Sequence, residues 1–184
     1  GSPAFDLRPE ARVSFLANHD QVANATGSER LPSPAASGAI RAMTAFVLLC
    51  PGTPMLFMGQ EWGASSPFPF FADHAGDLGR AVATGRRGFL AQFPSQASPA
   101  AQVQIPDPAE RATFERALLD HSERETADAR AALALHRDLL GLRRSEPSVR
   151  AASAGRDRVD GAVLGEQAFA VRFFGDPPGG PDDR

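Results

Sequence analysis

Two short runs of hydrophobic residues stand out against an otherwise mixed pattern of hydrophobic and polar positions. Val13-Ser14-Phe15-Leu16 and Met55-Leu56-Phe57-Met58 are brief and apolar rather than alternating, which is typical of buried strands in a parallel sheet covered on both faces. Between them, apolar residues recur at helical spacing near residues 36–50. Strand, helix and strand in this order predict a right-handed βαβ unit.

The stretch from Gly59 to about Pro106 is predicted to be loop-rich, with one helix near residues 76–91. Asp107-Pro108-Ala109-Glu110 is typical of a helix start, with Asp at the cap and Glu three residues later. A longer helix is predicted over roughly residues 125–144, with a basic end at Arg143-Arg144. Its apolar face would consist of Ala132, Leu135, Leu139 and Leu142.

After Pro147 the spacing of apolar residues is typical of β-strands rather than of helices. Residues 162–164 and 168–174 are apolar and separated by Gly165-Glu166-Gln167, which predicts two antiparallel strands. Two strands are too few for an independent β domain. We therefore interpret residues 148–184 as the beginning of a second domain that is cut short.

The composition limits which binding partners and which cellular compartment are expected. The formal net charge of -3 and a pI near 5.8 give no reason to expect nucleic acid. No apolar stretch approaches the roughly 20 residues of a membrane span, so no membrane is expected. The lone Cys50 lies in an apolar run, which predicts a buried, inert thiol. No signal peptide is recognised after Gly1-Ser2. A cytoplasmic location is therefore predicted, and the four histidines lack the spacing of metal ligands.

Polar side chains follow both predicted strands of the βαβ unit. Asn18-His19-Asp20 comes after the first, and Gln60-Glu61-Trp62 comes after the second. The carboxyl ends of parallel barrel strands meet at one face, where active sites lie. A carboxylate beside groups that bond hydroxyls suits a sugar-binding pocket, whereas a buried strand has little use for three consecutive polar side chains.

These motifs resemble the α-amylase family of glycoside hydrolases, and most closely its trehalohydrolase branch. The resemblance spans about residues 12–174. Phe15-Leu16-Ala17-Asn18-His19-Asp20-Gln21 is similar to the signature at the end of the seventh barrel strand, and residues 53–63 are similar to the eighth strand and its loop. Pro67-Phe68-Pro69-Phe70-Phe71-Ala72-Asp73-His74 is similar to the trehalohydrolase branch in particular.

The resemblance implies an α/β fold. Residues 1–147 would be the C-terminal portion of a (β/α)₈ TIM barrel, with its last two strands and helices, and residues 148–184 the start of an antiparallel β-sandwich domain. It also implies a retaining α-glycosidase that needs no cofactor. The substrate would be an α-glucan oligosaccharide, maltooligosyltrehalose, cut at the α-1,4 bond next to its trehalose end so that trehalose is released.

The resemblance also assigns roles to residues. Asp20 would stabilise the oxocarbenium-like transition state, and the alternative is that it only caps a loop. His19 would contact the same sugar, and the alternative is a purely structural histidine. Gln21 would reach substrate or brace the loop, and Trp62 would stack on a sugar or close the top of the barrel as a packed side chain. Asp73 and His74 would form a subsite pair or a loop-stabilising bond. The predicted substrate-binding residues are His19, Asn18, Gln21, Glu61, Trp62, Asp73 and His74.

The nucleophile and the acid/base of such enzymes lie on the fourth and fifth barrel strands, and no other carboxylate of this chain matches either position. The isolated chain is therefore expected to be inactive, and its exposed barrel edges are expected to favour self-association.

Two departures from the branch are Gln60 in place of an acidic residue and the absence of the expected Gly and Arg within residues 22–27. The alternatives are another α-amylase relative, such as a glycogen-branching enzyme, or a non-catalytic module that binds α-glucan or a partner.

Overall fold

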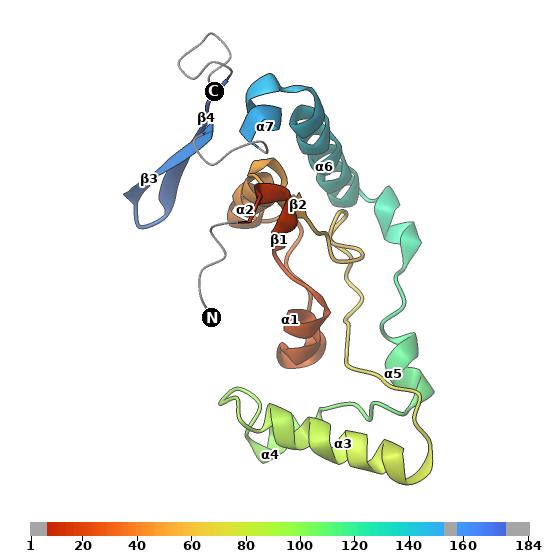
Figure 1. The fold of residues 1–184 in the computed structure, drawn as a ribbon. Coiled ribbons are helices and arrows are strands. Elements are labelled where there is room, and N and C mark those ends of the chain that lie inside the picture. The colour runs from red at the N-terminus through yellow and green to blue at the C-terminus, as the bar shows by residue number, and fades with distance from the viewer. Residues whose placement is uncertain (1–6, 153–157, 176–184) are drawn as a thin grey trace.

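The computed structural model describes residues 7–152 and 158–175. It contains a parallel sheet of two short strands (Figure 1). β1 (Val13–Ser14) pairs with β2 (Thr53–Pro54), and α2 (Gly38–Leu49) lies between them in the chain. The backbone N–H of Thr53 donates to the carbonyl of Arg12, and that of Met55 donates to Ser14, both at 2.8 Å. The predicted strand–helix–strand order is confirmed.

The predicted position and burial of the strands are wrong. The second strand was expected at residues 55–58, but the ladder ends at Met55 and the following residues turn, with Gln60 donating to the carbonyl of Phe57 at 2.9 Å. Val13 and Phe15 are exposed rather than buried. Within the described residues, β1 and β2 pair only with each other, so each keeps one free edge.

Most predicted helices are present, with small shifts at their ends. α3 (Gly76–Leu90) and α6 (Ala127–Ser145) match the predicted ranges, and Ser37 and Thr126 cap α2 and α6 with their hydroxyls. The expected start at Asp107 is wrong: its carboxylate holds a turn by accepting from the N–H of Ala109, and the helix begins later. The other helical segments are η1 (Pro9–Ala11), α1 (His19–Asn24), η2 (Thr26–Ser28), α4 (Pro99–Val103), α5 (Arg111–Glu115), η3 (His121–Glu125) and α7 (Pro147–Ala152).

The predicted apolar face of α6 is confirmed only in part: Ala132 is buried and Leu135 and Leu139 are half-buried. The most buried residues of the helix are Ala129, Ala132 and His136, whereas Leu142 is exposed. α6 packs against α2, and Ala129 contacts Trp62 and Ala64. His136 is accommodated because its Nδ1 lies 2.8 Å from the Ala132 carbonyl oxygen. A polar residue within hydrogen-bond reach of its own helix thus takes a core position that the apolar periodicity did not include.

Arg143 joins α6 to the C-terminal end of α2. Its guanidinium donates to the carbonyl oxygens of Leu48 (2.7 Å) and Cys50 (2.9 Å), and also to that of Gly52. Arg143, at the predicted basic end of the helix, is therefore held by backbone carbonyls, whereas Arg144 beside it is exposed. Burial raises the pKa of the half-buried Cys50 thiol, and the charge of Arg143 partly opposes that rise.

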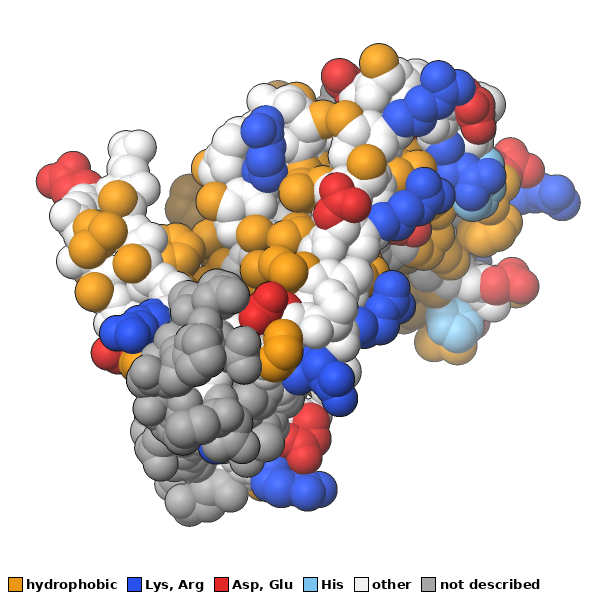
Figure 2. Space-filling view, turned by 90° about the horizontal axis from the view of Figure 1, so that it is seen from above, with side chains coloured by type: hydrophobic (Ala, Val, Ile, Leu, Met, Phe, Trp, Pro, Cys, Tyr) orange, Lys and Arg blue, Asp and Glu red, His pale blue; other side chains and the backbone are white. Residues whose placement is uncertain are grey.

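The C-terminal hairpin is confirmed, with a longer first strand than expected. β3 (Val159–Gly165) and β4 (Ala168–Phe173) are antiparallel, and Phe173 packs with Val149 of α7. Figure 2 shows hydrophobic side chains gathered on the outer part of the hairpin, at the left of the view, where Val163 and Leu164 are exposed. Among the helices of residues 7–152, none is long and apolar enough to span a membrane.

Candidate active-site cleft

The Asn18-His19-Asp20 motif begins helix α1, whereas a loop was expected there. Asn18 is the N-cap: its side-chain oxygen accepts from the backbone N–H groups of Asp20 (2.9 Å) and Gln21 (3.3 Å). The side-chain oxygen of Gln21 accepts in return from the Asn18 N–H at 2.8 Å. This capping box occupies the side-chain oxygens of both amides, which matches the bracing alternative for Gln21.

His19 and Asp20 stand free at the start of α1. Their side chains are 68% and 71% exposed, and His19 Nε2 lies 3.4 Å from Asp20 Oδ1. The cap fixes the backbone beneath them, while no described residue covers the carboxylate. The pair is therefore accessible to a ligand from solution.

A cleft opens beside this pair between α1, α3 and the loop at residues 68–71. It encloses about 520 Å³, which is within the usual size of a small-molecule site. Asp20 is the only carboxylate among its described lining residues. The lining consists of His19, Asp20, Ala23, Asn24, Phe68, Pro69, Phe70, Phe71, Arg86 and Phe89.

Arg86 links the two walls of this cleft. It donates from Nη1 to Asn24 Oδ1 (2.5 Å) and from Nη2 to the Ala23 carbonyl oxygen (2.7 Å), so α3 is held against α1. Arg86 is half-buried, whereas the neighbouring Arg87 is exposed. Partial burial lowers the pKa of the Arg86 guanidinium from its ordinary value.

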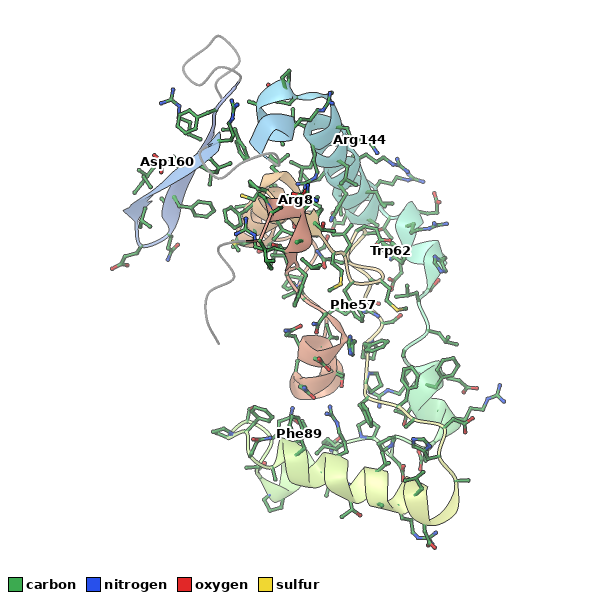
Figure 3. All side chains as sticks on the ribbon, viewed as in Figure 1. Arg8, Phe57, Trp62, Phe89, Arg144 and Asp160 are labelled. Atoms are coloured by element: carbon green, nitrogen blue, oxygen red, sulfur yellow. The ribbon has the colours of Figure 1, made fainter. Side chains whose placement is uncertain are left out.

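Trp62 lies outside the cleft, which corrects its assignment as a substrate-binding residue. The indole is 5% exposed and packs with Ala64 and Ala129 of α6. Its ring centroid is 5.4 Å from that of His121, and Figure 3 shows Trp62 near α6, in the upper half of the view, and Phe89 at α3, in the lower half. The hydrophobic effect draws this large apolar ring into the core, as in the packed alternative.

Glu61, Asp73 and His74 also lie away from the cleft lining. Glu61 faces Arg30, whose pKa is lowered by burial while the charge of Glu61 raises it. Arg30 was not anticipated, although it braces two loops by donating to the carbonyls of Ser66 and Met58, each at 2.6 Å. Asp73 lines a separate hollow with Phe71, Pro108 and Phe114, and the His74 side chain is exposed. The structure brings His19 and Asp20 together but not these three residues.

Replacing Asn18 with Ala is expected to lower the free energy of unfolding by about 1 kcal/mol, because two backbone N–H groups lose their acceptor. Chemical denaturation followed by circular dichroism measures this change. Asn18→Ser, which can still cap, serves as the matched control and should recover most of the loss. Equal destabilisation by the two variants would contradict the capping role.

Known proteins are similar to this chain in sequence. The chain is 42% identical over 147 residues to the malto-oligosyltrehalose trehalohydrolase of Deinococcus radiodurans, and 44% identical over 136 residues to that of Arthrobacter ramosus. These alignments cover 80% and 73% of the chain. The chain is homologous to malto-oligosyltrehalose trehalohydrolases. The expected likeness to the trehalohydrolase branch is confirmed.

The solved structures extend this likeness to the fold. A crystal structure described as a putative alpha amylase from Salmonella typhimurium superposes with a TM-score of 0.74 at 36% identity, over 90% of this chain and 27% of that one. The chain spans about a quarter of the length of the trehalohydrolases, namely 24% and 23% of the two above. No protein-family model matches the chain.

Proposed function

We propose that this chain is the part of a retaining α-glycosidase that carries Asp20, the carboxylate that stabilises the transition state. The enzyme would hydrolyse the α-1,4 bond next to the trehalose end of maltooligosyltrehalose and release trehalose. The single observation that carries the proposal is the exposed His19–Asp20 pair, set beyond β1 and open to a cleft of ligand size. The likeness to trehalohydrolases supports the choice of substrate.

The proposed architecture follows from the same likeness. β1, α2, β2 and α6 would be the last two strand–helix pairs of a (β/α)₈ barrel, and the β3–β4 hairpin would begin the β-sandwich domain. The free edges of β1 and β2 would then pair with the neighbouring barrel strands. Asp20 would lie at the carboxyl ends of the strands, where such barrels hold their active sites.

Chemistry at this site requires three carboxylates. In retaining glycosidases a nucleophile and an acid/base lie about 5–5.5 Å apart across the scissile bond. Asp20 would sit beside the developing positive charge, and His19, 3.4 Å away, would bond to a hydroxyl of the same sugar. Because Asp20 is the only carboxylate lining the cleft among the described residues, the chain alone would release no trehalose.

A hybrid enzyme tests the function. In it, residues 12–174 of this chain replace the matching segment of the Deinococcus radiodurans trehalohydrolase, which supplies the rest of the protein. We expect the hybrid to release trehalose from maltooligosyltrehalose, while the 184-residue chain alone releases none. A folded hybrid that leaves maltooligosyltrehalose intact, or that instead forms α-1,6 branches on linear glucan, would overturn the proposal.

A further inference from the structure

The end of the cleft formed by α3 carries two exposed aromatic rings around one arginine. Phe70 and Phe89 are 40% and 45% exposed, although aromatic side chains of this size usually bury most of their surface. The Arg86 Cζ atom lies 5.1 Å from the centroid of the Phe70 ring and 5.9 Å from that of Phe89. Figure 3 shows Phe89 on the side of α3 that faces α1.

Arg86 holds this group rigid. Two of its nitrogens are already committed to Asn24 and to the Ala23 carbonyl, so the guanidinium is fixed in the wall rather than free to bind an anion. Contact between the cation and the ring faces orients both phenylalanines. The rings therefore present surfaces whose positions are set before any ligand arrives, which reduces the entropy lost on binding.

A flat sugar ring matches such a surface. The C–H bonds on the face of a pyranose carry a small positive charge, whereas the face of an aromatic ring is negative. Burial of the apolar sugar face against phenylalanine also removes both surfaces from water. The hydroxyls at the rim of the sugar can remain hydrated because the cleft is open.

We propose that Phe70 and Phe89, braced by Arg86, form a stacking platform that binds a second glucosyl unit of the α-glucan whose reacting sugar lies at Asp20. The proposal rests on the proposed function, since both ends belong to one continuous cleft. The platform would determine the preferred length of substrate, while His19 and Asp20 act on the reacting sugar. Helix α1 and residues 68–89, which are far apart in sequence, would then bind different sugar units of the same oligosaccharide.

Maltotriose titration of the 184-residue chain, followed by NMR of the backbone amides, tests the platform directly. We expect saturable shifts at α3 and at residues 68–71. Phe89→Leu, which keeps apolar bulk but removes the flat ring, should weaken binding about three- to tenfold. Phe70→Leu provides a second variant if Phe89→Leu disturbs the fold. The matched control is Phe169→Leu, because Phe169 is 47% exposed but lies on the C-terminal hairpin.

The outcomes separate the platform from catalysis. Absence of saturable shifts at tens of millimolar maltotriose, or equal weakening in Phe89→Leu and Phe169→Leu, would overturn the platform. Binding that depends on Phe89 in the chain, together with an inactive hybrid, would leave the platform standing and remove the proposed function. An active hybrid whose KM for maltooligosyltrehalose is unchanged by Phe89→Leu would remove the platform alone.

Discussion

Replacing Asp20 with Asn in the hybrid enzyme is expected to lower kcat for maltooligosyltrehalose by about 10²–10³-fold. Asn keeps the size of the side chain and can still bond to hydroxyls, but it carries no negative charge. The charge matters most when the sugar becomes oxocarbenium-like, so the loss falls on the transition state more than on substrate binding. Steady-state measurements of kcat and KM on purified protein give the result.

The control for this substitution is Asp138→Asn, which removes the same charge from an exposed position on α6. Asp138 lies outside the cleft, so kcat should be unchanged. The role of Asp20 would be contradicted if both variants retained full activity. It would also be contradicted if Asp20→Asn raised KM strongly while kcat stayed constant, because that pattern describes a residue that binds substrate and transition state equally.

Replacing Arg143 with Ala is expected to lower the free energy of unfolding by about 2–4 kcal/mol. The guanidinium is a charged donor to three carbonyl oxygens at and just beyond the end of α2, and their loss leaves these acceptors without a protein partner. The segment from Leu48 to Gly52 leads directly into β2, so the strand pairing with β1 should weaken as well. Urea denaturation followed by circular dichroism measures the difference.

Arg144→Ala is the matched control for Arg143→Ala. Arg144 is the next residue on the same helix and is exposed, so its removal should change stability by less than about 0.5 kcal/mol. Arg143→Lys tests the geometry, because one ammonium cannot reproduce a planar guanidinium that reaches several carbonyls. If the two alanine variants were equally stable, the clamp would contribute nothing to the fold.

The helices and the hairpin could be predicted from sequence because their signals are local. α2, α3 and α6 follow from helical spacing and nearby breakers, and the β3–β4 hairpin follows from two apolar runs around a short turn. The parallel strands were misplaced because their limits depend on hydrogen bonds between residues about 40 positions apart, such as that from Thr53 to Arg12. Residue type alone cannot show where that pairing ends.

The site could be predicted only in part, for a similar reason. His19 and Asp20 were found because they adjoin each other in a motif, and the structure sets both in one cleft. Arg86 was missed because it meets α1 across a long stretch of chain: Arg86 and Asn24 are 62 positions apart. Phe89 was missed with it, because it lines the cleft from the same helix. Trp62 was predicted to bind substrate but lies in the core. A tryptophan after a strand suits a binding loop and a hydrophobic core equally well, so its position in the sequence could not decide between them.

The two ends of the cleft come from separate stretches of the chain. The end at Asp20 depends on β1 and the Asn18 cap, whereas the opposite end depends on α3 and the loop before it. The two ends are joined by Arg86 of α3, which donates to Asn24 and to the Ala23 carbonyl oxygen of α1, so changes in the α3 wall leave the position of α1 intact only where this link is kept. Under the proposed function, related enzymes could therefore vary the aromatic part of the α3 wall, and with it the sugars they prefer, as long as an arginine at position 86 preserves the link to α1.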